Sequence, residues 1–223
     1  MPVTTGFLGA LAPTERETLQ ATGRVARFGK GDVLFRQGDT SDTVVVLLAG
    51  WVKAVAGTPE GNEVVLAVRG PGDLVGELAA IDGRDAPRSA SVIALQPVEC
   101  RMLRGEEFRS FVAAHSDAGL VLLRTLTRRL RDADRRRMEY GGYDTARRLA
   151  RVLVELATEH GRPTAGGLEL ALALSQQELA GLSAVSRESV ARALGKLRSL
   201  GLVSTARCRV TVHDPEGLAA FAE

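Results

Sequence analysis

The stretch LSQQELAGLSAVSRESVARALGKLRSLGLV, residues 174–203, predicts two short helices joined by a tight turn. Ser175 followed by Glu178 fits a capping box, so the first helix is expected to start there. Gly181 predicts an early end for this helix, because glycine adopts the left-handed cap conformation at little cost. A short helix therefore precedes the most strongly patterned segment of the chain.

A second helix is expected to start at Ser186, a good N-cap residue, and to be closed by Gly201. Its apolar residues share one face, and these are Val190, Leu194 and Leu197. Its polar residues are the candidates for contact with DNA, and these are Ser186, Arg187, Glu188, Ser189, Arg192 and Lys196. A short helix with an apolar back and a basic front fits the major groove of DNA. A solvated amphipathic helix in any small helical domain is the alternative.

Length and composition limit the classes of protein that the chain can be. With 223 residues, 45% of them apolar, it can form one large domain or two modest ones. The net charge is only +2, so affinity for nucleic acid must come from a local patch. Charges interrupt every apolar run, and the N-terminus lacks the basic region of a signal peptide, so we expect a cytoplasmic protein without a membrane partner. Cys100 and Cys208 are expected to pack as ordinary small side chains.

Between residues 25 and 103, short apolar runs alternate with turns that contain glycine. The expected strands are Val33–Phe35, Val44–Leu48, Val64–Val68 and Ala90–Leu95. This spacing predicts a β-sandwich or roll. The second and third runs are apolar on both faces, which predicts burial on both sides. A short helix with Thr14 as its cap is expected before the roll, over residues 12–21.

The segment GELAAIDGRDAPRSASV, which begins at Gly76, has the chemistry of a nucleotide site. Gly76 lets the backbone bend closely around a ligand, and the residues after it can present N–H groups to an anion. Arg88 can make a two-pronged contact with a phosphate, and Ser89 adds a hydroxyl donor. Glu77 carries a carboxylate that suits a sugar hydroxyl. A surface ion pair around a loop is the alternative for Glu77 and Arg88.

One long helix is expected from Glu106 to about Tyr140, because this segment holds no proline and a single glycine, Gly119. Apolar residues recur along it at spacings of three and four. This pattern fits packing against the roll or a coiled-coil seam with a second copy of the chain. The seam is favoured, because the helix is longer than the roll that it could cover. The arginines after Leu123 are more typical of a solvated face than of a binding site.

The C-terminal part, after a hinge at Gly141-Gly142, is expected to hold a helix, a loop, a short strand and a β-hairpin. These elements fall at Asp144–His160, residues 161–167, Leu168–Leu172, and Leu202–Thr205 with Cys208–Val212. Together with the two helices of residues 174–203 they predict a winged helix. Arg207 and Arg209 at the hairpin tip would suit backbone phosphates, although scattered exposed arginines would look the same.

Two of these segments resemble those of a known family, the CRP–FNR transcription regulators. SRESVAR, residues 186–192, resembles the recognition helix of the cyclic-AMP receptor protein branch. The segment that begins at Gly76 resembles the phosphate-binding cassette of cyclic-nucleotide-binding domains, and the resemblance extends over roughly residues 6–110. It implies the following ligand contacts: Glu77 at the ribose 2′-hydroxyl, Arg88 and Ser89 at the cyclic phosphate, and Gly76 and Leu78 lining the turn.

The resemblance also implies that the long helix crosses over the purine of the ligand. LTRRLRDADR then places Arg129 near Glu77. The two hydroxyl residues that touch the adenine in the family are replaced by Ala133 and Asp134. Ala133 cannot hydrogen-bond a base, whereas Asp134 can accept from the adenine amino group. The expected effector is cAMP or another cyclic nucleotide, with no metal. A different small molecule, or none, is the alternative.

Carried onto SRESVAR, the resemblance implies that Arg187 and Arg192 each read a guanine and that Glu188 reads a cytosine amino group. Hydrogen-bond geometry favours the same pairings. We expect a homodimer that binds a pseudo-palindrome in double-stranded DNA, with half-sites like TGTGA about one helical turn apart. RNA polymerase is the further partner that such a regulator implies.

The expected fold class is α+β, with a cupin-like β-roll as sensor over residues 1–105. A long dimerisation helix and hinge follow over residues 106–142, and a winged helix-turn-helix domain over residues 143–223. The remote alternative is a metal-dependent enzyme on a cupin-like roll. Such enzymes use clusters of histidines and carboxylates, and the histidines of this chain lie outside the roll, at His115, His160 and His213. We therefore expect a ligand-gated regulator and not an enzyme.

Overall fold

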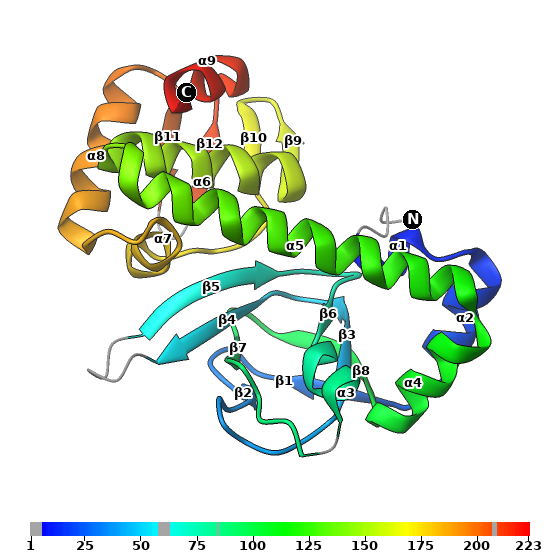
Figure 1. Ribbon diagram of the computed structural model, residues 1–223. Helices are drawn as coiled ribbons and strands as arrows, with labels where there is room; N and C mark the ends of the chain where they lie inside the picture. The colour runs from blue at the N-terminus through cyan, green and yellow to red at the C-terminus, as the bar shows by residue number, and fades with distance from the viewer. Residues whose placement is uncertain (1–5, 58–62, 84, 207–208) are drawn as a thin grey trace. The chain divides into compact units, whose positions relative to one another are not determined.

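The computed structural model describes residues 6–57, 63–83, 85–206 and 209–223 (Figure 1). The chain divides into two compact units, Met1–Ala133 and Asp134–Glu223. Within the described ranges, no helix is both long enough and apolar enough to span a membrane.

The first unit contains the predicted roll, built from two antiparallel sheets. Its strands are β1 Arg24–Phe28, β2 Val33–Phe35, β3 Val44–Ala49, β4 Val52–Gly57, β5 Glu63–Arg69, β6 Leu74–Val75, β7 Ser91–Ala94 and β8 Val98–Leu103. The strand order is β1-β8-β3-β6 in one sheet and β2-β7-β4-β5 in the other. The roll and the four strands expected from the sequence are confirmed.

Strand β3 is buried on both faces, as the sequence predicts. Val44 and Val46 belong to the cluster beneath the helices of the unit, while Val45 and Leu47 belong to the cluster inside the roll. The same expectation is wrong for β5, where Leu66 is 46% exposed. The register of the β4–β5 pairing shifts at this point, from Ala54 opposite Ala67 to Val55 opposite Val65, so Leu66 lies at an irregularity of the strand.

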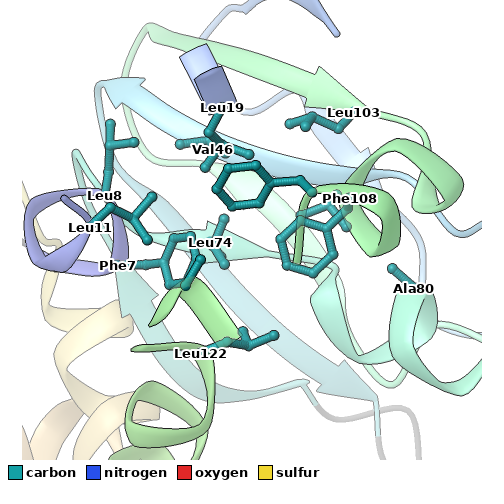
Figure 2. Packing of buried hydrophobic residues seen from close by; sticks show 13 residues of the cluster. Phe7, Leu8, Leu11, Leu19, Val46, Leu74, Ala80, Leu103, Phe108 and Leu122 are labelled. Atoms are coloured by element: carbon teal, nitrogen blue, oxygen red, sulfur yellow. The ribbon is translucent and has the colours of Figure 1, made fainter. Parts of the chain in front are cut away.

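Four short helices cover one side of the roll. They are α1 Gly6–Ala10, α2 Pro13–Ala21, α3 Glu77–Asp82 and α4 Gly105–Ala114. Figure 2 shows how Phe7 of α1, Leu19 of α2 and Phe108 of α4 gather in one buried cluster. The predicted cap of α2 is wrong by two positions: Ala12 takes the N-cap position, and its N–H donates to the Glu15 carboxylate at 3.0 Å.

The single helix predicted from Glu106 to Tyr140 is two helices. The first is α4, which ends at Ala114, and α5 runs over Ser116–Gly142. Between them His115 is extended, with φ −130° and ψ 90°. Its ring Nδ1 lies 2.8 Å from the carbonyl oxygen of Phe111, and its own carbonyl accepts from Gly119 N–H at 3.2 Å. His115 thus closes one helix and opens the next, an arrangement that apolar spacing does not reveal.

The second unit contains the predicted winged helix. Its elements are α6 Thr145–His160, β9 Gly161–Thr164, β10 Gly167–Leu170, α7 Gln176–Ser183, α8 Arg187–Ser199, β11 Val203–Ala206, β12 Arg209–Val212 and α9 Pro215–Ala222. The helix α6, capped by Asp144, packs against α8 and α9. The sheet order is β11-β12-β10-β9. The predicted β11–β12 hairpin is confirmed, whereas residues 161–167 are not simply a loop, because β9 pairs with β10.

Candidate ligand pocket and DNA-reading helix

The ligand cassette begins where β6 ends, at Gly76. Its φ of +84° lies in the left-handed region, and the helix α3 starts at the next residue. A Cβ at Gly76 would lie 2.7 Å from Nη1 of Arg88 and 2.7 Å from the carbonyl oxygen of Thr43. Glycine is therefore needed here for two reasons, the turn itself and the close approach of the guanidinium.

Arg88 is buried beside this turn, with 4% of its surface exposed. Its Nε and Nη2 both donate to Oγ of Ser41, at 3.1 and 2.8 Å. Nη2 also donates to the carbonyl of Thr43 at 2.6 Å, and Nη1 donates to the carbonyl of Gly76 at 2.9 Å. The guanidinium carbon lies 3.9 Å from the centre of the Phe35 ring. The predicted phosphate ligand is thus held in place by four hydrogen bonds and an aromatic face.

Burial lowers the pKa of Arg88, because an apolar environment disfavours the charged form. The negative charges of Asp42, Glu77 and Asp39 act in the opposite direction. The guanidinium is a buried cation, and its charge can pair with a phosphate or carboxylate that reaches it.

Glu77, the predicted ribose ligand, is also buried, with 4% of its surface exposed. Its Oε1 accepts from Nη1 of Arg129 at 2.6 Å, and Nη2 of Arg129 donates to the carbonyl of Leu74 at 2.9 Å. The contact between Glu77 and Arg129 that the family resemblance implies is confirmed. It ties the cassette to α5.

The remaining predicted ligand residues are placed differently. Leu78 is 47% exposed, and Ser89 is exposed on the segment after Arg88. Asp134 is exposed and belongs to the second compact unit. Their ligand contacts stay predictions. Ser41 and Thr43 were missed from the sequence, because nothing in the local pattern of residues 36–43 indicates a partner of Arg88.

The predicted helix-turn-helix is confirmed, with one correction in the turn. The capping box is present: Glu178 N–H donates to Oγ of Ser175 at 3.2 Å, and Ser175 N–H donates to the Glu178 carboxylate at 2.7 Å. The helix α7 does not stop at Gly181 but continues to Ser183. Ala184 takes the left-handed cap conformation instead, with φ +49°. Gly201 closes the second helix with φ +71°, as predicted.

Helix α8 has the predicted apolar back and polar front. Val190, Leu194 and Leu197 are buried, whereas Arg187, Glu188 and Arg192 are exposed. The pKa of the Glu188 carboxyl lies below its ordinary value, because the group accepts from its own backbone N–H and lies near positive charges of Arg187 and Arg192. The front of the helix therefore presents the donors of Arg187 and Arg192 and the ionised acceptor of Glu188.

A chain of hydroxyl contacts orders the start of α8. Ser189 N–H donates to Oγ of the N-cap residue Ser186 at 3.2 Å, and the two hydroxyls lie 3.1 Å apart. Nη2 of Arg192 then donates to Oγ of Ser189 at 2.9 Å. Ser189 thus positions the guanidinium of Arg192, a role that the sequence does not reveal. The Lys196 ammonium lies 5.1 Å from the centre of the Phe221 ring in α9, and its contact with DNA stays a prediction.

A groove of about 410 Å³ lies between the start of α7, the front of α8 and the hairpin. Its lining includes Gln176, Arg187, Thr205 and Arg209. Arg209 approaches Glu169 with its Nε 3.5 Å from the carboxylate. Arg207, predicted to contact phosphates, lies outside the described residues. No group of three or more histidine, cysteine, aspartate or glutamate side chains suited to a metal ion occurs in the described part of the chain.

Two family models match the chain. The model of the cyclic nucleotide-binding domain matches residues 25–115, and the model of the Crp-like helix-turn-helix domain matches residues 147–221. The first covers the roll, the cassette and α4, and the second covers most of the winged helix.

Similar proteins span nearly the whole chain. The cyclic AMP receptor protein of Thermus thermophilus is 30% identical over 210 residues, which are 92% of this chain and 90% of that protein. A CRP-like cAMP-activated global transcriptional regulator of Mycobacterium tuberculosis is 29% identical over 214 residues, with 96% and 95% covered. The solved structure of the c-di-GMP responsive global regulator CLP of Xanthomonas campestris is 26% identical, with a TM-score of 0.74 and 91% and 100% covered.

Proposed function

The chain belongs to the CRP/FNR family of transcriptional regulators, and on that premise we propose that it is a homodimer that binds a palindromic DNA site under the control of a cyclic nucleotide. The family consists of regulators and not of enzymes. Its two domains account for the two functions, ligand binding and DNA binding. The effector, the DNA half-site and the dimer are the parts of the proposal that need experiments.

One observation supports a cyclic nucleotide as the effector: the cassette holds a buried guanidinium and a buried carboxylate. Arg88 and Glu77 are each 4% exposed, and each is held in place, Glu77 by Arg129 and Arg88 by four hydrogen bonds. The guanidinium suits a phosphate and the carboxylate suits a ribose hydroxyl, so together they fit the two polar parts of a cyclic nucleotide. Among such ligands we propose cAMP, for which two of the relatives are named.

Calorimetry with cAMP, cyclic GMP and c-di-GMP tests this proposal directly. We expect binding of cAMP by the wild-type chain and a loss of most of the affinity in Arg88→Gln, since the phosphate then meets a neutral amide. The DNA affinity measured with and without the bound nucleotide shows whether the ligand acts as a switch. A regulator whose DNA affinity is the same with every nucleotide contradicts cyclic-nucleotide gating.

A regulator of the same fold with another effector, or none, is the second candidate. The structure offers one observation in its favour: four N–H groups of Arg88 are already bound to Ser41, Thr43 and Gly76. This arginine therefore needs no phosphate to satisfy most of its donors. The absence of binding for the whole nucleotide panel, with DNA binding intact, would identify this candidate.

The proposed DNA half-site follows from the front of α8. We propose that Arg187 and Arg192 each contact a guanine and that Glu188 accepts from a cytosine amino group, which gives a half-site like TGTGA. Selection from a random DNA library should return two such half-sites about one helical turn apart. Replacement of Arg187 with alanine should cost about 1–3 kcal/mol and relax the preference at one base pair. An equal loss on all sequences would show that Arg187 touches only phosphate.

The proposed dimer rests on the exposed leucines of α5. Leu120, Leu123 and Leu130 are 50%, 61% and 61% exposed, and their spacing places them on one side of the helix. Leu120 and Leu123 also line an apolar groove of about 570 Å³ between α4 and α5. A second copy of α5 would cover this surface as a coiled coil.

Light scattering tests the dimer with a matched pair of variants. Leu123→Glu should convert the dimer to a monomer, because two carboxylates would face an apolar seam. Leu200→Glu is the control, since Leu200 is 53% exposed in the second unit. A monomeric wild-type chain, or two variants with equal mass, would reject the seam.

A further inference from the structure

The connection between β2 and β3 is fastened to the cassette segment that carries Arg88. Gly38 N–H donates to the carbonyl of Arg88 at 2.9 Å, and Arg88 N–H donates to the carbonyl of Asp39 at 2.9 Å. Thr40 and Pro87 form an antiparallel bridge beside these bonds. Because of these ties, Ser41 is held at the guanidinium although 47 positions separate the two residues.

The hydroxyl of Ser41 occupies the edge of the guanidinium that is best suited to an oxyanion. Both Nε and Nη2 donate to the Ser41 Oγ, at 3.1 and 2.8 Å. An arginine grips a phosphate or carboxylate with two parallel N–H groups, and Nε with the neighbouring Nη is such a pair. The other edge of the guanidinium already donates to the carbonyls of Thr43 and Gly76. A phosphate that takes Arg88 by two prongs must therefore displace Ser41.

We propose that Ser41 is an internal competitor for the ligand phosphate, and that its hydroxyl sets the affinity of the cassette. The inference rests on the proposed function, because it assumes that the ligand carries an anionic phosphate. A phosphate oxygen forms a charge-assisted hydrogen bond with Arg88 that is roughly twice as strong as that of a neutral hydroxyl. The phosphate therefore displaces the Ser41 hydroxyl. The bonds between Arg88 and Ser41 are lost in that exchange, which weakens the observed affinity.

The residues around Ser41 offer a complete set of variants for calorimetry with cAMP and cyclic GMP. Ser41→Ala removes the competitor, and the affinity should rise on the order of tenfold. Ser41→Thr keeps a hydroxyl and should restore the wild-type affinity. Ser41→Asp places a carboxylate on the same edge, and the affinity should fall below that of the wild-type chain. Thr40→Ala is the matched control in the same connection, because its exposed side chain is not part of the contact.

The outcomes separate the inference from the proposed function. Equal affinity in the wild-type chain and Ser41→Ala, with cAMP bound by both, overturns the inference and leaves the proposed function standing. A weaker affinity in Ser41→Ala also overturns it, because Ser41 would then be a ligand of the phosphate. If Ser41→Ala binds cAMP and the wild-type chain does not, the inference is supported and gating of the wild-type chain by cAMP is rejected.

If neither the wild-type chain nor Ser41→Ala binds any cyclic nucleotide, the inference and the proposed effector are both rejected. A last measurement uses adenosine, which lacks the phosphate. Its affinity should be the same in the wild-type chain and Ser41→Ala. A gain for adenosine as large as that for cAMP would show a general loosening of the pocket and would overturn the inference.

Discussion

Replacement of Arg129 with methionine should destabilise the first unit, because it leaves the carboxylate of Glu77 without its cation. The Arg129 and Glu77 side chains are 17% and 6% exposed, and the Nη1–Oε1 distance is 2.6 Å. Removal of one partner of a buried ion pair costs about 3–5 kcal/mol. Because Arg129 is partly reached by solvent, water can enter the space that it leaves. We therefore expect a loss of about 2–3 kcal/mol in the free energy of unfolding.

The chain contains a single tryptophan, which makes the measurement specific to the unit in question. Trp51 is buried in the first unit with 5% of its surface exposed, so its fluorescence in urea reports the unfolding of the roll. The matched control is Arg128→Met, since Arg128 is an exposed neighbour on the same helix. That change should cost less than about 0.5 kcal/mol.

A double-mutant cycle with Glu77→Gln isolates the interaction from the effects of each side chain alone. We expect a coupling energy of about 1–3 kcal/mol between positions 77 and 129. Equal stability of Arg129→Met and Arg128→Met would refute the reasoning, and so would a coupling energy below about 0.5 kcal/mol. The ion pair would then contribute nothing measurable to the free energy of unfolding.

Four further changes have defined outcomes. Gly76→Ala should lower the thermal midpoint of the first unit in calorimetry, because its φ is +84° and its Cβ would lie 2.7 Å from the Arg88 Nη1; an unchanged midpoint would mean that the turn relaxes freely. Ser189→Ala should reduce discrimination at the base pair that Arg192 is proposed to read in DNA-binding assays, with protein stability nearly unchanged, because Ser189 accepts from that guanidinium at 2.9 Å. The pKa of Asp144 is lowered, mainly by the N–H of Arg147, so its stabilising effect is complete above the unfolded pKa of about 3.9 and is lost as the pH falls through the lower folded value. The stability difference between the wild-type chain and Asp144→Asn should therefore shrink from pH 6 to acid pH in urea titrations, and a constant difference would contradict the assignment. Burial raises the pKa of the Cys100 thiol to about 11, so in a Cys208→Ser background the native protein should not react with a thiol reagent at pH 8, whereas the unfolded protein should.

The cassette was predictable because its residues are close in sequence. Gly76, Glu77 and Arg88 form one motif, and the motif alone indicates an oxyanion site. Ser41 was not predictable, because a serine between two strands carries no pattern and its partner lies far along the chain. Its position depends on the bridge between Thr40 and Pro87, which is a tertiary contact.

The errors in the helices have local causes that spacing rules do not capture. The predicted long helix breaks at His115, where a ring nitrogen lies 2.8 Å from the carbonyl oxygen of Phe111 and the chain turns extended. Gly181 was expected to end α7 because glycine reaches the left-handed region most easily. Ala184 does so instead, with its N–H and that of Val185 bonded to carbonyls near the end of α7. Residue preference predicts the type of element here, whereas local hydrogen bonds determine where its last turn ends.

Strand β3 divides its side chains between two cores, Val44 and Val46 on one side and Val45 and Leu47 on the other. A slip by one position would exchange the two faces, and the run from Val44 to Leu47 would still place apolar side chains in both cores. Hydrophobicity alone therefore does not choose the register of β3. Side-chain shape and the pairing with β8 and β6 must do so, which makes this strand the place where a misfolded roll would be hardest to distinguish from the native one.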